Sequence, residues 1–274
     1  MGTRNRPLSK ESFKSEIWKY YSSHRRAFPW RETKDPYKIL VSEIMLQQTQ
    51  VERVMHKYGR FITRFPGFSA LAKADLQSVL QVWQGLGYNR RAIALKKCAS
   101  RVVTDHAGEL PKTVSELVRL PGIGSATAGS ILAFAYNIPT PFIETNIRRV
   151  FIHFFFPERN DVKDSEILPL VEETLDREDP RQWYYALMDY GARLKSKTPN
   201  PNRRSAHYAR QSPLEGSDRQ IRGKILKALL SHGSTGEQAL IDEMGKDPDR
   251  VRRILLAMET EGFLKRSGGL ISLA

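Results

Sequence analysis

The stretch 113-TVSELVRLPGIGSATAGSI-131 contains two short helical patterns separated by Leu-Pro-Gly-Ile-Gly. Gly122 and Gly124 permit a tight turn that a residue with a Cβ would obstruct. The second helix starts directly after the turn, so the free backbone N–H groups of the turn and of the first helical residues, Ser125 and Thr127 among them, point outwards together. Such a cluster of donors at a helix N-terminus is suited to binding a phosphate.

The charge of the chain favours nucleic acid as the source of that phosphate. Its 274 residues include 44 Lys+Arg against 30 Asp+Glu, which gives a formal net charge of +14 and a pI of about 9.9. A surplus of this size favours a polyanion, nucleic acid before an acidic membrane. We therefore interpret residues 113–131 as a helix-hairpin-helix element that holds duplex DNA by its backbone. The alternative is an ordinary corner between two helices.

Other function classes are disfavoured. No apolar run approaches the roughly 18–20 residues that cross a bilayer, and the N-terminus has no apolar signal segment. We expect a cytoplasmic, nucleoid-associated protein. Cys98 is the only cysteine, which excludes an intramolecular disulfide and an all-cysteine metal site, and the six His show no metal-binding spacing. No metal site is therefore predicted.

Helical periodicity dominates outward from the hairpin, with tight Gly/Pro turns between the segments, and predicts an all-α core. The expected helices cover residues 10–22, 39–47, 50–65, 68–73, 76–83, 90–105, 113–119, 125–135, 145–155, 165–175 and 181–193.

The composition changes after this core. Residues 195–216, KSKTPNPNRRSAHYARQSPLEG, are basic and rich in Pro and Asn, typical of a linker or of an ordered loop lying on a charged partner. Residues 217–274 show three helical segments, the second of them capped by Thr235, and then two short strand-like runs around Ser-Gly-Gly. This is the winged-helix pattern, whose third helix usually enters a DNA groove. Arg250, Arg252 and Arg253 on that helix are suitable DNA contacts; a structural or protein-binding winged helix is the alternative.

Two acids stand out as candidate catalytic groups. Glu144, in 141-PFIETNIRRV-150, lies where a helix restarts after two prolines, and the helix dipole favours its ionised form. The neighbouring Arg148 and Arg149 would hold such a carboxylate near DNA phosphates. Glu43 interrupts an apolar helix face in 39-ILVSEIMLQQTQV-51, where loss of water raises a carboxyl pKa and suits it to proton donation near neutral pH. Gln47 and Gln48 follow as neutral groups that can fill space in a base stack.

The chain resembles the helix-hairpin-helix (HhH-GPD) DNA glycosylases, and within them the MutY-type adenine glycosylases. The shared stretches are FPWR, PYKILVSEIMLQQTQV, FPGFSALAKADLQSVLQVWQGLGY and LPGIGSATAGSIL, which together with the acid near 144 span about residues 25–195. The resemblance implies a two-lobed helical glycosylase core at 1–194, followed by the basic loop at 195–216 and the small winged-helix domain at 217–274.

The resemblance also implies roles for single residues. Glu43 matches the general acid that protonates the leaving base, Glu144 the acid that stabilises the cationic sugar, and Asn146 a polar residue that orients it. Gln48 and Tyr88 match residues that enter the duplex as the base flips out. The pocket around the flipped base is matched by Arg26, Trp30, Arg31, Leu46 and Asp189.

Four features depart from the family pattern. The family's cluster-binding cysteines are missing, so no iron–sulfur cluster is expected. The basic loop is expected to contact phosphates instead, through Lys195, Lys197, Arg203, Arg204 and Arg210. Ala126 stands where bifunctional relatives carry a Schiff-base Lys. Glu144 replaces the usual Asp, which moves the carboxylate by about 1–1.5 Å. The winged helix replaces the C-terminal domain that reads 8-oxoguanine.

These features predict a monofunctional DNA glycosylase of base excision repair, monomeric and acting on double-stranded DNA. It would flip a mispaired base, adenine opposite guanine or 8-oxoguanine first, and hydrolyse its N-glycosidic bond. No cofactor is expected, apart from a monovalent cation at the helix-hairpin-helix turn. The alternatives are a glycosylase for thymine or uracil opposite guanine or for another modified base, and a DNA-binding protein without catalysis.

Overall fold

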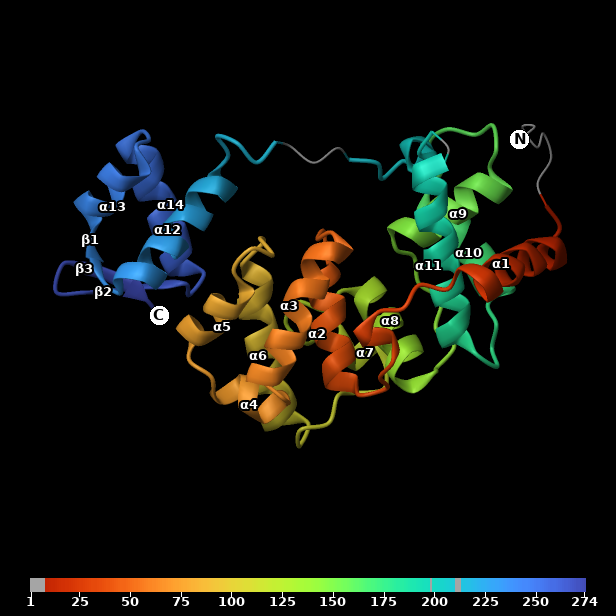
Figure 1. Cartoon of the computed structure of the whole chain (residues 1–274), viewed down its shortest axis with the longest axis horizontal. Helices are drawn as coiled ribbons and strands as arrows, with labels where there is room; N and C mark the ends of the chain where they lie inside the picture. Colours follow the sequence, from red (N-terminus) through yellow and green to blue (C-terminus); the bar gives the residue numbers. More distant parts are fainter. Residues whose placement is uncertain (1–7, 198, 210–212) are drawn as a thin grey trace. The chain divides into compact units, whose positions relative to one another are not determined.

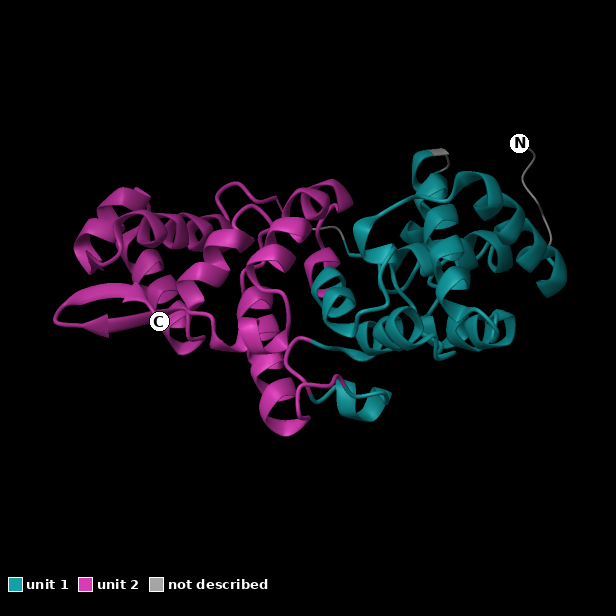
Figure 2. Ribbon diagram, turned by 60° about the horizontal axis from the view of Figure 1, so that its bottom comes forward, with its two compact units in different colours: residues 1–43, 111–119, 123–210 teal, residues 44–110, 120–122, 211–274 magenta. Residues whose placement is uncertain are grey.

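The structure, a computed structural model, describes residues 8–197, 199–209 and 213–274. Within them it is mostly helical, with fourteen α-helices, two short 3₁₀ helices and three strands (Figure 1). The chain groups into two compact units (Figure 2): residues 1–43, 111–119 and 123–210, and residues 44–110, 120–122 and 211–274. Helix α2 (Pro36–Leu46) begins in the first unit and ends in the second.

The first unit joins the N-terminal helix to helices that lie much further along the chain, from α7 onward. Its remaining elements are α1 (Lys10–His24), η1 (Pro29–Arg31), α7 (Val114–Leu117), α8 (Ser125–Tyr136), α9 (Thr145–Phe155), α10 (Asp164–Thr174), α11 (Pro180–Lys197) and η2 (Pro201–Arg204).

An aromatic cluster packs α1 against α9 and α11, two helices that carry residues of the candidate site. The ring of Phe13 lies 5.2 Å from that of Phe151 and 5.3 Å from that of Phe154, both on α9, and 5.9 Å from Trp183 on α11. All four side chains are buried. Aromatic side chains contribute large apolar areas and edge-to-face contacts, so this cluster fixes α9 and α11 against each other and against α1.

The second unit begins with four helices that follow α2, namely α3 (Val51–Arg64), α4 (Phe68–Lys73), α5 (Leu76–Trp83) and α6 (Arg90–Asp105). Arg91 of α6 is buried and donates hydrogen bonds to the carbonyls of Ile44 and Met45 at the end of α2, at 2.8 and 2.7 Å. It also donates to the carbonyl of Gly87, at 2.9 Å. A single guanidinium thus fixes the end of α2 and the loop before α6, the two segments that carry Gln48 and Tyr88.

The C-terminal part of the second unit holds three helices and a small sheet. The elements are α12 (Asp218–His232), β1 (Thr235–Gly236), α13 (Glu237–Met244), α14 (Pro248–Thr260), β2 (Leu264–Ser267) and β3 (Leu270–Leu273). The strands form an antiparallel sheet in the order β1-β3-β2. Strand β1 is absent from the sequence prediction, which assigned Thr235 to a helix cap. Thr235 instead pairs with Ile271 of β3, and Gly236 is the N-cap of α13.

The predicted helices are present, and their ends differ mostly by one to three residues. Helix α9 begins at Thr145 with Glu144 as its N-cap, as the sequence predicts. The largest difference is at α11, which continues to Lys197 instead of ending at residue 193. The change of composition at residue 195 therefore precedes the end of the helix, because polar and basic residues are good helix formers as well as linker residues.

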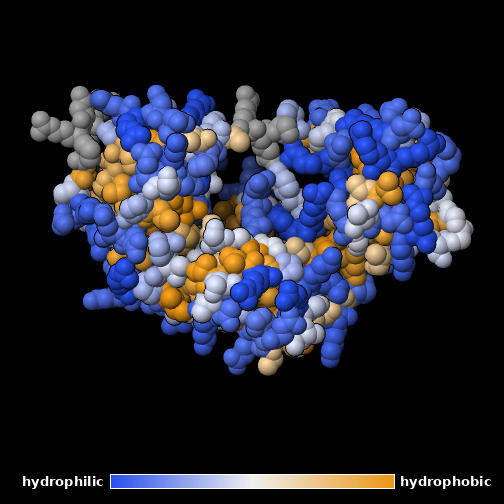
Figure 3. All heavy atoms as spheres, turned by 180° about the vertical axis from the view of Figure 1, so that it is seen from behind, coloured by the Kyte–Doolittle hydropathy of each residue, from blue (hydrophilic) through white to orange (hydrophobic). Residues whose placement is uncertain are grey.

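A mainly hydrophilic surface is expected for a chain in which 27% of the residues are charged. The face seen in Figure 3 is mainly hydrophilic, and hydrophobic side chains are visible in smaller patches. Among the described residues, no helix combines the length and the apolar character that crossing a membrane requires.

Candidate active site

The carboxyl group of Glu43 is held by a serine from the helix after the hairpin. Glu43 lies on α2 and is partly exposed, while Ser130 lies on α8 and is buried. The Ser130 hydroxyl donates to Oε2 of Glu43 at 2.6 Å. Because this oxygen accepts a hydrogen bond, a proton on the carboxyl group is directed to the other oxygen, Oε1, which is then free to donate it.

The environment of Glu43 suits proton donation at neutral pH. The pKa of Glu43 is raised to about 7, mainly by burial: the bond from Ser130 lowers it, the carboxylate of Glu144 raises it, and the charge of Arg31 lowers it. The sequence prediction of a raised pKa is confirmed in direction. A group with a pKa near the working pH is present in both protonation states and is the most effective general acid or base.

Glu144 caps the N-terminus of α9 with its side chain. Its Oε1 accepts hydrogen bonds from the backbone N–H of Asn146 at 2.7 Å and of Ile147 at 2.9 Å. Its Oε2 accepts one from the Asn146 amide at 3.3 Å. The carboxylate is thus held against its own helix by three donors, and the orientation of Asn146 is linked to it.

Opposing effects act on the charge of Glu144. Burial raises its pKa, and the two backbone donors together with the charges of Arg149 and Arg148 lower it. The net direction is upward. The sequence argument, which considered the helix dipole alone, predicted that the ionised form would be favoured; the loss of water around a buried carboxyl group outweighs the dipole and the cap.

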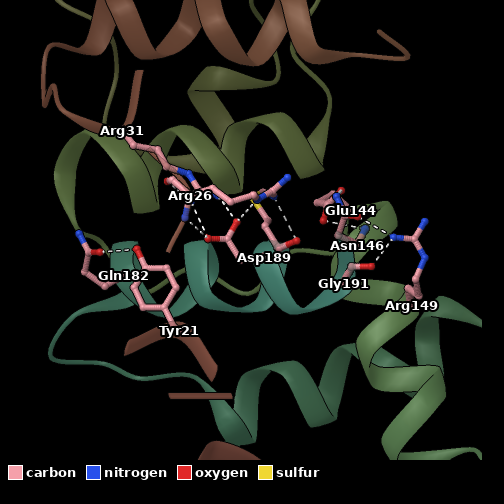
Figure 4. A network of polar contacts seen from close by, with 10 residues as sticks. Tyr21, Arg26, Arg31, Glu144, Asn146, Arg149, Gln182, Asp189 and Gly191 are labelled. Atoms are coloured by element: carbon pink, nitrogen blue, oxygen red, sulfur yellow. Dashed lines mark hydrogen bonds and ion pairs between the residues drawn. The ribbon is translucent and has the colours of Figure 1, made fainter. Parts of the chain in front are cut away.

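A second polar network centres on Asp189 of α11 and involves three predicted pocket residues (Figure 4). Asp189 is buried, and each of its carboxyl oxygens accepts two hydrogen bonds. Arg31 supplies two of them at 2.9 Å, and Arg26 supplies one from Nε at 2.6 Å and one from its backbone at 3.0 Å. With its oxygens occupied, Asp189 holds these two arginines in place, whereas the resemblance implies that it contacts the base itself.

Of the other two pocket residues, Trp30 directly precedes Arg31 in the sequence, and Leu46 lies in the other compact unit. Trp30 is buried and stacks on Phe28, with ring centroids 5.1 Å apart. Arg31 lies over the ring of Tyr185, 4.4 Å from its centroid. Leu46 is partly exposed at the end of α2, three residues after Glu43. The arrangement places two carboxyl groups with different hydrogen-bond partners beside a buried ion-pair network, which suits acid-assisted cleavage with stabilisation of a cation.

Comparison with known proteins assigns the family. Residues 41–172 match the HhH-GPD superfamily base excision DNA repair protein model. The chain is 32% identical to an adenine DNA glycosylase of Mycolicibacterium smegmatis over 270 residues, covering 92% of each chain. The chain belongs to the HhH-GPD superfamily of base excision DNA repair proteins. It is therefore a DNA glycosylase, as the resemblance in its sequence indicates.

Further relatives agree with this superfamily assignment. An adenine DNA glycosylase of Buchnera aphidicola is 38% identical over 186 residues, which are 66% of this chain and 52% of that protein, so this match spans about half of the relative. A thermostable thymine-DNA glycosylase of known structure is 28% identical, with a TM-score of 0.62 over 67% of this chain and 86% of that one. An endonuclease III in a non-covalent complex with DNA has the same fold, with a TM-score of 0.60 and 18% identity.

The superfamily's hairpin is present with the predicted turn. Gly122 has φ +83°, and Gly124 is the N-cap of α8. Ser125 is exposed as the first residue of that helix, and the carbonyl of Thr127 accepts a bond from Ser130. The hairpin helix therefore carries both the expected phosphate-binding N–H groups and the serine that holds Glu43.

Two residues expected to enter the duplex have unusual backbones. Gln48 and Tyr88 have φ values of 53° and 47°, a region that non-glycine residues seldom occupy and that costs about 1–3 kcal/mol each. They line a cavity of about 700 Å³ together with Gln47, whose amide donates to the Gly122 carbonyl at 3.2 Å. The Tyr88 hydroxyl accepts a bond from Arg219 at 2.8 Å. Strain of this kind is often found at functional positions.

Most of the arginines expected to contact phosphates are engaged within the protein. Arg203 and Arg253 are exposed, and Arg210 lies outside the described residues. The others bond to protein groups: Arg148 to Asp164, Arg204 to the carbonyls of Phe156 and Pro157, Arg250 to Asp218, and Arg252 to Asp249. Their guanidinium groups have to exchange or share these partners to reach DNA.

Sequence reasoning missed Ser130, which holds Glu43, and it missed Asn200 and Gly191, which both accept hydrogen bonds from Arg149 of α9. Ser130 is the polar residue of an otherwise apolar stretch of α8, a signal comparable with that of Glu43 on α2. Asn200 lies in the segment treated as a loop on DNA, and nothing in its local pattern indicates a contact with α9.

One cysteine, Cys98, is present in the whole chain and is buried, so the chain lacks the cysteine set of an iron–sulfur cluster.

Proposed function

We propose that the protein is a monofunctional glycosylase that removes a mispaired base from double-stranded DNA, with adenine opposite guanine or 8-oxoguanine as its first substrate. The observation that carries this proposal is the carboxyl group of Glu43, with a pKa of about 7, hydrogen-bonded by Ser130 and electrostatically coupled to a second carboxyl group, Glu144. A DNA-binding protein without catalysis would not need a partly buried acid held in this way.

In the proposed reaction, Glu43 donates its proton to the leaving base as the N-glycosidic bond breaks. This bond cleaves with development of positive charge on the sugar, and the Glu144 carboxylate stabilises that charge. Asn146 keeps the carboxylate oriented. Water then adds to the sugar carbon, loses a proton to the Glu43 carboxylate and leaves an abasic site. Glu43 and Glu144 thereby divide the work of acid and electrostatic stabiliser, as two carboxyl groups in different environments can.

The choice of adenine rests on the adenine glycosylases among the relatives. Arg26, whose side chain is 37% exposed and ion-paired with Asp189, would donate hydrogen bonds to the base, and the buried Arg31 would fix Asp189. The likeness to a thymine-DNA glycosylase favours thymine or uracil opposite guanine as the second candidate. Donor groups of this kind are compatible with acceptors on either base.

We also propose that the enzyme has no efficient lyase activity, since Ala126 occupies the position of the Schiff-base lysine of bifunctional relatives. The glycosylase core would comprise residues 1–194. Residues 217–274 would form a separate winged-helix domain that binds DNA through α14. The enzyme would act as a monomer. The hairpin N–H groups, a monovalent cation bound there, and Arg203 would contact the backbone.

A panel of duplexes tests the function directly. Each contains one mispair, namely adenine opposite guanine or 8-oxoguanine, or thymine or uracil opposite guanine, and base release is measured with and without subsequent cleavage at abasic sites. We expect release of adenine, and strand cleavage only after alkali treatment. Release of thymine or uracil alone would select the second candidate, and strand cleavage without alkali would contradict the monofunctional assignment.

A further inference from the structure

The Cys-free segment that follows α11 is bonded to the N-terminus of α9, where Glu144 lies. Asn202 is buried, and its amide donates to the carbonyl of Thr145 at 2.9 Å. The backbone N–H of Asn202 donates to Oδ1 of Asn200 at 3.2 Å. Because Thr145 is the first residue of α9 and directly follows Glu144, the segment fixes the peptide next to the candidate catalytic carboxylate.

A second set of contacts reaches the carboxylate through side chains. Arg149 of α9 is buried; its Nε donates to Oδ1 of Asn200 at 3.0 Å and its Nη1 to Oδ1 of Asn146 at 2.6 Å. With this oxygen occupied, the Asn146 amide directs its N–H towards Oε2 of Glu144. The charge of Arg149 also lowers the pKa of Glu144. Asn200 is thus connected to Glu144 by three consecutive hydrogen bonds.

Close packing of α11 against α9 supports this arrangement (Figure 4). The carbonyl of Gly191 accepts a bond from Nη1 of Arg149 at 2.8 Å. A Cβ at Gly191 would lie 2.5 Å from the backbone oxygen of Asn146, so only glycine permits this approach. The guanidinium of Arg149 therefore has partners on α9, on α11 and in the segment after α11.

We propose that Asn200 and Asn202 are positioning residues of the glycosylase reaction: through Arg149, Asn146 and Thr145 they fix the carboxylate of Glu144. The segment after α11 is then part of the catalytic machinery as well as a surface for DNA. This inference rests on the proposed function, because it assigns the carboxylate of Glu144 to the chemical step. A displacement of about 1 Å in a catalytic group can lower a rate by roughly 10²-fold.

Single-turnover base release at saturating enzyme, with DNA affinity measured in parallel, tests the proposal. Asn200→Ala and Asn202→Ala are each expected to lower the rate by about 10-fold or more, with Kd within about twofold of the wild type. Asn200→Asp, which keeps the acceptor for Arg149, is expected to retain the rate within about threefold. The acidic limb of the pH–rate profile should move to higher pH in Asn200→Ala, because Arg149 no longer lowers the pKa of Glu144 as strongly.

The matched control is Asn160→Ala, an exposed asparagine of the same unit outside these contacts. It should leave both rate and affinity unchanged. All rates are measured well below the lowest unfolding temperature, and Asn202→Ala and Asn200→Asp carry the test if Asn200→Ala does not fold. Variants with wild-type rates and an unmoved pH profile would overturn the positioning role alone. A wild-type protein that releases no base would overturn the proposed function, and this inference with it.

Discussion

Replacing Glu43 by Gln is expected to stabilise the folded protein at neutral and alkaline pH while it removes base release. Gln keeps the shape of the side chain and can accept the hydrogen bond from Ser130, but it carries no charge. The substitution therefore separates the energetic cost of the buried acid from its packing. A residue retained for chemistry often lowers stability in this way.

The magnitude follows from the pKa of Glu43, which burial raises from 4.5 to about 7. Below pH 4.5 the carboxyl group is protonated in both the folded and the unfolded chain and has no effect on the pH dependence. Between the two values the folded protein holds a proton that the unfolded chain has released, so stability falls as pH rises. Above pH 7 the raised pKa lowers the free energy of unfolding by about 3 kcal/mol, at roughly 1.4 kcal/mol for each tenfold change in proton affinity.

Urea unfolding of wild type and Glu43→Gln at a series of pH values from 4 to 8.5 measures this difference. We expect the free energy of unfolding of the variant, relative to wild type, to increase by about 2–3 kcal/mol across this range, less than the full value because Glu43 is partly exposed. Glu109→Gln, at an exposed position, is the control and should show no comparable trend. A difference that is constant, or that falls as pH rises, would refute the assignment of Glu43 as a buried acid with a raised pKa.

Three other substitutions test separate parts of the account. Glu144→Asp should keep the free energy of unfolding within about 1 kcal/mol, because Asp also caps helices, but should lower the single-turnover rate by about 10-fold or more as the carboxylate retracts; a faster variant would contradict this placement. Asp189→Asn should lower stability by about 3 kcal/mol in urea unfolding, since it leaves the buried guanidinium of Arg31 without its anion. The exposed control Glu32→Gln should change it by less than about 0.5 kcal/mol, and equal effects would argue against the buried pair. Gly122→Ala should weaken DNA binding by about 10-fold or more, because φ is +83° and its Cβ would lie 3.0 Å from that of Ala94; an unchanged Kd would separate the hairpin turn from DNA.

Local patterns predicted most of the helical fold because many of the helices have an apolar stripe of their own and Gly or Pro stands near many of their ends. The LPGIG turn and the cap of α9 at Glu144 are local features of this kind. Strand β1 was not predicted because Thr235 and Gly236 have no alternating pattern of their own. They form a strand only through pairing with Ile271 and Leu270, more than thirty residues away in the chain.

The candidate site shows the same division. The acid on the apolar face of α2 indicates that Glu43 has a raised pKa, because the apolar pattern that marks a helix face for burial can be read locally. The partner that holds it, Ser130, is 87 residues away, and its contact follows from how α2 and α8 pack. For Glu144, the start of α9 could be predicted from the sequence. The burial that raises its pKa, against the effect of the helix dipole, comes from elements distant in the chain.

The most direct test of the central claim is single-turnover base release from a duplex containing adenine opposite 8-oxoguanine or guanine, for wild type and Glu43→Gln. We expect the wild type to release free adenine and leave an abasic site, and the variant to be slower by about 10²–10⁴-fold, the usual contribution of a general acid. Equal rates for the two proteins would contradict the role of Glu43. No release by the wild type from any duplex of the mispair panel would contradict the proposed function as a whole.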